Sequence, residues 1–311
     1  MLTKIKKALA TCPQDGMIYL IIKLSDASGF FMAHRHLIYI VINCEATKHQ
    51  SLATEYLRLN TDVEVSAIEC NQQFPSGRYN MLEALPVDDS YDDETLNSFM
   101  NLCLAHTEHM SGLSFLDFFH SLVNLFQYPR EQDYKNLIGL FGELSFIKHV
   151  YDKAGVDLSE KWHVSGCSSK YDIVTDWGNL EIKSTRAADE LVTIKHDQLF
   201  NSDRNFLVTV MMEECAGGIT LNQLIKKMHD QRGCFNGYLF TLNLEKERRR
   251  VSPVDAEVKK FNVYETRIYE AKAINPFEKI PANIANLTYQ LDLIDQPDVA
   301  LEDWFKKCSN I

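Results

Sequence analysis

The stretch YDIVTDWGNLEIKST, residues 171–185, constrains the fold of this chain more than any other part of the sequence. Apolar and polar residues alternate in two short runs, 171–175 and 180–184, which predicts two β-strands joined by a tight turn. A register slip of one residue would bury charge and expose apolar side chains, so the pairing of the strands is well determined. Between the runs lie three turn-forming residues: Asp176, Gly178 and Asn179.

The predicted hairpin gathers charged side chains on one of its faces. Side chains alternate along a strand, so Glu181 and Lys183 share a face, and Asp172 lies across from one of them. Carboxylates of this kind bind Mg²⁺ or Mn²⁺, and a neighbouring lysine orients water and stabilises charge, as phosphodiester cleavage requires. The alternative is an ordinary solvent-exposed strand face, on which such a pattern is common.

A predicted helix upstream brings a third acid. Apolar residues recur at helical spacing across residues 137–151. Gly139 and Gly142, three residues apart, form a flat strip on which the helix can approach a sheet closely. Glu143 follows at the edge of the apolar stripe, where it can reach over the sheet. A solvated helix glutamate is the alternative interpretation of Glu143.

The order of these parts resembles the PD-(D/E)XK nuclease superfamily, and within it the bacterial "PD-(D/E)XK motif protein" family. The resemblance rests on a helix with G-x-x-G-E, an Asp strand, E-I-K, and a segment ending in D-Q-L. It implies that Asp172, Glu181 and Lys183 are the motif residues, with Glu143 as the helix acid and Gln198 as the glutamine that follows. The resemblance implies metal ligation by Asp172, Glu181 and Glu143. Tyr171 stands where the motif has its proline, which lowers the specificity of the match.

The resemblance also implies a fold and a function. The expected fold class is α/β (α+β), with a restriction-endonuclease-like core of a mixed central sheet flanked by helices. The expected domains are a β-rich N-terminal module with following helices, residues 1–128, and a nuclease-like domain, residues 129–311, with the boundary at Tyr128 and Pro129. The expected function is a Mg²⁺- or Mn²⁺-dependent DNA endonuclease of a bacterial restriction or anti-phage defence system. Partner proteins (an ATPase/helicase or a methyltransferase) and a homodimer are implied with it.

The amino-acid composition and the absence of certain motifs limit the classes of protein to which this chain can belong. No run approaches the roughly 18 apolar residues that span a membrane. Eight cysteines without any C-x-x-C pair suit free thiols in a reducing compartment, so we expect a cytoplasmic protein. Walker, dinucleotide-binding and G-x-S-x-G motifs are absent from the sequence, which leaves helicase, dehydrogenase and serine hydrolase interpretations without a motif.

The net charge of −11 argues against tight DNA binding through the overall field of the chain. Contact with DNA would then depend on a local patch, on the metal, or on a partner. Several stretches of the chain are rich in lysine or arginine and could form such a patch, but each is interpreted equally well as a solvated loop or helix face. The candidate stretches are Lys226 and Lys227, Lys246 with residues 248–250, and Lys259 and Lys260.

The remaining patterns predict further elements. In the N-terminal region, His34 and His36 alternate along one expected strand, but a metal site there has no third ligand. Strands are expected at residues 17–24, 35–43, 63–70, 78–85, 193–199, 206–212, 238–243 and 261–273, and helices at 94–107, 114–126 and 220–230.

Two functions from different classes remain open on the sequence alone. The first is the metal-dependent nuclease. The second is a nuclease-fold DNA-binding or assembly subunit without hydrolytic activity of its own.

Overall fold

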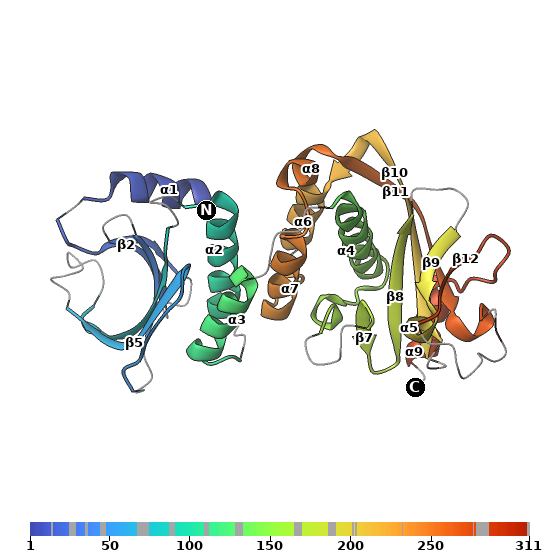
Figure 1. Ribbon diagram of the computed structural model, residues 1–311, viewed down its shortest axis with the longest axis horizontal. Coiled ribbons are helices and arrows are strands. Elements are labelled where there is room, and N and C mark those ends of the chain that lie inside the picture. Colours follow the sequence, from blue (N-terminus) through green and yellow to red (C-terminus); the bar gives the residue numbers. More distant parts are fainter. Residues whose placement is uncertain are drawn as a thin grey trace. The chain divides into compact units, whose positions relative to one another are not determined.

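The chain folds into two compact units, Met1–Pro129 and Arg130–Ile311, which we describe one at a time. The structure is a computed structural model (Figure 1). It describes residues 1–13, 15–24, 29–34, 37–43, 48–66, 75–86, 91–108, 112–127, 133–164, 170–185, 191–200, 202, 204–231, 233–275, 277 and 286–309.

Unit 1 contains a six-stranded antiparallel sheet, which Figure 1 shows as strongly curved. The core on one face of this sheet includes Phe30, Met32, Val41 and Tyr79. Its strands lie in the order β1-β2-β3-β6-β5-β4, with the bounds β1 Tyr19–Lys23, β2 Gly29–His34, β3 Leu37–Asn43, β4 Ser51–Ala53, β5 Leu57–Val65 and β6 Gly77–Ala84.

Three helices complete unit 1: α1 (Leu2–Thr11), α2 (Asp93–Glu108) and α3 (Phe115–Gln127). Helix α3 begins where the sequence predicted, because the Ser114 hydroxyl accepts a hydrogen bond from the Asp117 amide at 3.1 Å. The β-rich character of this region and helices α2 and α3 are confirmed, whereas α1, β2 and β4 were not expected. His34 ends β2, and His36, Tyr128 and Pro129 lie outside the described residues.

Unit 2 is built on a four-stranded mixed sheet in the order β11-β10-β8-β7. The central pair is parallel, with Leu207 beside Glu181, and the two outer pairs are antiparallel. The bounds are β7 Ile173–Thr175, β8 Gly178–Thr185, β10 Asn205–Thr220 and β11 Lys260–Glu270. A mixed sheet with flanking helices is the fold class that the sequence predicted, and it is confirmed.

Helix α4 (Tyr134–Ala154) covers one face of this sheet (Figure 1). Leu180 and Ile182 of β8 and Val208 of β10 pack in one core with the apolar side chains of α4. Further helices complete this side: η1 Ser159–Lys161, α6 Leu221–His229, α7 Tyr238–Arg248, α8 Pro253–Val258 and α9 Leu301–Ser309. Helix α6 starts at a capping box formed by Thr220 and Gln223, in agreement with the predicted helix start.

The other face of the sheet carries a separate small layer. Strands β9 (Leu191–Lys195) and β12 (Thr288–Asp292) pair antiparallel, and α5 (His196–Leu199) follows β9 directly. Their side chains and those of the short helix η2 (Ala271–Ala273) form a second core with Leu207 and Tyr269. Both faces of β8 are therefore covered, so Glu181 is buried rather than exposed.

Several predicted elements differ from the structure. Residues 238–243 form the start of helix α7, not a strand, because they continue into the helix-favouring run Glu245–Arg248 and are buried on most sides. Gln198 lies on helix α5, not at the end of a strand, and β11 gives way to η2 at Ala271. In the hairpin, Gly178 and Asn179 belong to β8, so the turn contains only Asp176 and Trp177.

Close approach between α4 and β8 depends on one of the two helix glycines. A methyl group added at Gly142 would overlap Ser184 Oγ and lie 2.9 Å from Ser184 Cβ. At Gly139 the same addition meets no atom within 4 Å, so the predicted role in close packing is wrong for that residue. The Ser184 side chain packs against the helix here.

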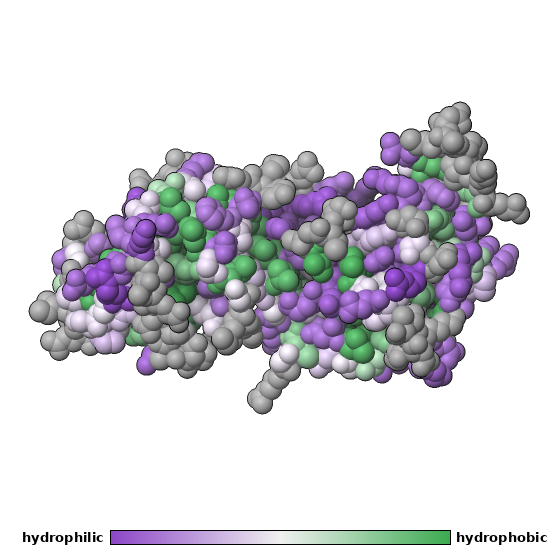
Figure 2. Space-filling view, turned by 90° about the horizontal axis from the view of Figure 1, so that it is seen from below, coloured by the Kyte–Doolittle hydropathy of each residue, from purple (hydrophilic) through white to green (hydrophobic). Residues whose placement is uncertain are grey.

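No helix in the described part of the chain is long and apolar enough to cross a membrane. Figure 2 shows one face of the surface, on which hydrophobic residues occur in patches interrupted by hydrophilic ones.

The two glycines give a matched pair for a stability test. We expect Gly142→Ala to destabilise unit 2 by about 1–3 kcal/mol, because the added methyl group forces α4 away from β8. Gly139→Ala should stabilise the helix by about 0.5–1 kcal/mol, because alanine has the higher helix propensity. All three tryptophans lie in unit 2, so urea unfolding followed by tryptophan fluorescence measures both effects. Equal effects of the two substitutions would contradict this account of the packing.

Candidate active site

Strand β8 supplies two of the predicted site residues to one face of the sheet. Leu180 and Ile182 point into the core under α4, so Glu181 and Lys183 point to the opposite face, beneath the β9–β12 layer. The Glu181 side chain is 4% exposed and that of Lys183 is 30% exposed. The period-two spacing of E-x-K therefore places the acid inside the unit and leaves the lysine partly open to solvent.

Both oxygens of Glu181 accept hydrogen bonds. Lys183 Nζ donates to Oε1 at 2.5 Å, and Gln198 Nε2 donates to Oε2 at 2.5 Å. Gln198 reaches the acid from α5, which the β9–β12 pair holds over this face of the sheet. The carboxylate is thus fixed in one orientation, and each oxygen keeps a lone pair for another partner.

Asp172 lies immediately before β7, at the point where that strand ends its pairing with β8. Its amide donates to Leu180 O at 3.1 Å, and its Oδ2 accepts a bond from the amide of Ile182 at 2.6 Å. The register of the hairpin, Ile173 opposite Leu180, brings Asp172 beside Glu181. The predicted juxtaposition of Asp172 with the E-x-K strand is present.

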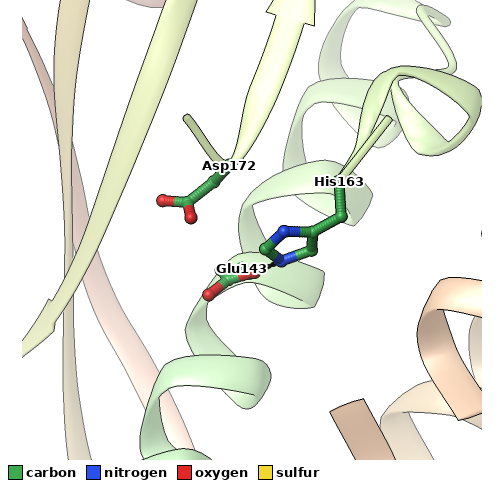
Figure 3. Close-up of side chains that lie close together, drawn as sticks. All are labelled: Glu143, His163 and Asp172. Atoms are coloured by element: carbon green, nitrogen blue, oxygen red, sulfur yellow. Dashed lines mark hydrogen bonds and ion pairs between the residues drawn. The ribbon is translucent and has the colours of Figure 1, made fainter. Parts of the chain in front are cut away.

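Glu143 projects from α4 toward the same region (Figure 3). Its Oε2 accepts hydrogen bonds from Trp162 Nε1 at 2.7 Å and from His163 Nε2 at 2.9 Å. The Glu143 side chain is 17% exposed, so it is not an ordinary solvated helix glutamate.

His163 is a member of this cluster that the sequence analysis missed. Ligand atoms of Glu143, His163 and Asp172 all lie within 4.8 Å of one another, and Figure 3 shows the three side chains turned toward a common space. His163 lies nine residues before Asp172, in a turn after η1, with no motif that marks it. An antiparallel bridge between Trp162 and Ile173, with the His163 amide donating to the Asp172 carbonyl at 2.9 Å, ties the two segments together, and no sequence pattern reports such a contact.

The electrostatics of the cluster follow from burial of like charges. Burial, and then the charges of Glu143 and Glu181, raise the pKa of Asp172 well above its ordinary value. Burial also raises the pKa of Glu181, although Lys183 opposes the shift. Burial alone would lower the pKa of Lys183, but the neighbouring carboxylates, Glu181 first, raise it overall. Lysine at this position is therefore a stable ammonium group and a hydrogen-bond donor.

The donor set fits a divalent cation. The carboxylates of Glu143, Asp172 and Glu181 interact here with one lysine among the described residues, and burial, followed by the charges of the neighbouring acids, raises the pKa of Asp172 and of Glu181. Hard divalent ions take carboxylate oxygens as ligands. Ligand atoms of Glu143, His163 and Asp172 lie close enough together to hold such an ion, whereas Glu181 is outside that group and its two oxygens accept hydrogen bonds from Lys183 and Gln198.

A mixed sheet whose central strand presents an acid and a lysine, under a helix that adds another acid, defines the restriction-endonuclease-like class of fold. A family model described as "Putative PD-(D/E)XK family member, (DUF4420)" matches residues 118–294, more than half of the chain, and the chain belongs to this family. The family is nuclease-like, and all five predicted site residues lie within the matched range. No curated protein and no solved structure matches the chain.

Because the pKa of Asp172 is raised, the difference in the free energy of unfolding between the wild type and a variant without this acid should depend on pH. An acid whose folded-state pKa exceeds its unfolded value, about 3.9, stabilises the fold at low pH and loses that contribution as pH rises through the folded pKa. We therefore expect Asp172→Asn to stabilise the metal-free protein increasingly as the pH rises above about 4, by at most about 1.4 kcal/mol per pH unit. Urea unfolding in EDTA measures the difference.

Asp176→Asn, at the exposed turn of the same hairpin, is the control and should give a small difference in the free energy of unfolding. A constant loss of stability in Asp172→Asn would mean that the hydrogen bond to Ile182, rather than buried charge, dominates at this position.

Proposed function

We propose that this protein is a metal-dependent DNA endonuclease that hydrolyses phosphodiester bonds. The observation that carries the proposal is the convergence of Asp172, Glu181 and Glu143 with Lys183 in a chain of the PD-(D/E)XK family. A structural ion-pair network would need matched charges, whereas this cluster has more acids than cations among the described residues.

Each residue has a role that its contacts support. Asp172, Glu181 and Glu143 hold Mg²⁺ or Mn²⁺. The ion supplies Lewis acidity and lowers the pKa of water bound to it. Lys183, as an ammonium group, orients the attacking water and stabilises negative charge that develops on the phosphate. Gln198 fixes the orientation of Glu181 through its 2.5 Å hydrogen bond.

DNA as the substrate fits the motif. The negative net charge of the chain means, however, that its affinity for DNA needs further sources of positive charge. Several of the basic residues considered for DNA contact instead pair with acids of the same unit: Lys259 with Glu214 at 2.9 Å and Arg250 with Glu247 at 3.0 Å. With a net charge of −11, affinity for DNA then comes from the bound ion and from partners. We propose that these are a second copy of the chain and an ATPase/helicase or methyltransferase of a bacterial defence system, in the cytoplasm.

Cleavage of DNA tests the proposed hydrolysis. Purified chain should nick supercoiled plasmid or cut single-stranded DNA with Mg²⁺ or Mn²⁺ and not with EDTA. Asp172→Ala and Lys183→Ala should each lower the rate by about 10²-fold or more, because each removes an interaction made at the reacting phosphate. Lys306→Ala, at an exposed lysine of the same unit, should leave the rate unchanged.

Metal binding, measured beside cleavage, tests the site and distinguishes the two candidate functions. Mn²⁺ should raise the thermal unfolding midpoint of the wild type and not that of Asp172→Ala, because binding to the folded state stabilises it. Cleavage that survives both site substitutions would refute the assigned site. Metal binding without cleavage, also in the presence of the partners, would support the alternative of a nuclease-fold binding or assembly subunit.

A further inference from the structure

The backbone at His163 is held in an uncommon conformation. Its φ angle is 48°, in the left-handed region, which costs a residue with a Cβ about 1–2 kcal/mol. Three hydrogen bonds hold it there. The His163 amide donates to Asp172 O at 2.9 Å, and Asn243 Nδ2 donates to the carbonyls of Trp162 and His163 at 2.9 and 3.1 Å. Strain maintained in this way occurs most often at functional sites.

The imidazole ring is directed at the acids. Nε2 lies 2.9 Å from Glu143 Oε2, and one ring nitrogen lies within 4.8 Å of ligand atoms of both Glu143 and Asp172 (Figure 3). Adjacent ligand atoms on an octahedral ion, with bonds of about 2.1 Å, are about 3 Å apart. The 2.9 Å spacing, which is a hydrogen bond in the metal-free protein, would place the two atoms as neighbouring ligands once His163 Nε2 has lost its proton to make room for the ion.

A role in orienting the Glu143 carboxylate does not by itself explain why the His163 imidazole lies here. Trp162 Nε1 already donates to the same oxygen at 2.7 Å, and Trp162 is fully buried. Trp162 therefore holds this oxygen in place without the imidazole ring. The ring, whose side chain is 23% exposed, instead extends to the space that Asp172 also faces.

We propose that His163 is a direct nitrogen ligand of the divalent ion, together with Glu143 and Asp172, and that the site therefore binds Mn²⁺ in preference to Mg²⁺. The proposal rests on the metal site of the proposed function and adds a ligand to it. Mg²⁺ binds oxygen almost to the exclusion of nitrogen, whereas first-row transition ions accept imidazole. A nitrogen ligand thus shifts the selectivity of a carboxylate site toward the transition ions.

Pulsed electron paramagnetic resonance of Mn²⁺ bound to the full chain, without DNA, tests the ligand directly. A coordinated imidazole gives ¹⁴N modulation, which we expect in the wild type and not in His163→Asn. Asparagine tolerates the left-handed backbone, so this variant should fold, and its urea unfolding checks that it does. We expect His163→Asn to weaken Mn²⁺ binding by about 10-fold or more and Mg²⁺ binding by much less.

His149→Asn is the matched control, because His149 lies on the same helix as Glu143 but outside the cluster. It should keep the ¹⁴N modulation and the Mn²⁺ affinity. Mn²⁺ bound to the wild type without ¹⁴N modulation, or modulation retained in His163→Asn, would overturn the inference and leave the carboxylate metal site intact. Modulation in a chain that does not cleave DNA, also in the presence of the partners, would support His163 as a ligand and refute the hydrolysis instead.

Discussion

Burial of several carboxylates in one place is the constraint on which the architecture of unit 2 depends. Uncompensated charge in a protein interior is strongly unfavourable, so each acid needs donors. The donors come from different elements: Lys183 and the Ile182 amide from β8, Gln198 from α5, and Trp162 and His163 from the turn after η1. The cluster is therefore the place where the sheet, both of its covering layers and a turn meet.

Regular spacing made the hairpin and part of the cluster predictable. The alternation of Leu180, Glu181, Ile182 and Lys183 fixes which side chains share a face, and the structure agrees. The helical spacing of the apolar residues predicted α4 and the approach of Glu143 to the sheet. Residues that follow from a period of 2 or 3.6 could be placed because their neighbours are near in sequence.

Features that depend on tertiary contacts could not be placed in this way. His163 reaches the acids through a bond to Asp172 and through Asn243, eighty residues further along the chain. The run at residues 238–243 is short and apolar, a pattern that fits a buried strand and a buried helix equally well, and packing against α4 and η1 decides for the helix. Gln198 was expected at the end of a strand and instead lies on helix α5, which begins where β9 ends, although its side chain does reach Glu181.

The layer over Glu181 has a consequence for the order of events during synthesis. β9 and α5 are made soon after β8, but the strand with which β9 pairs is β12, with Tyr289 opposite Ile194. That partner emerges from the ribosome about ninety residues later, after roughly 5–20 s at ordinary elongation rates. A nascent chain that has already formed α4 and the central strands thus still lacks the cover that brings Gln198 to the acid. Completion of the charged cluster therefore waits until β12 has been synthesised.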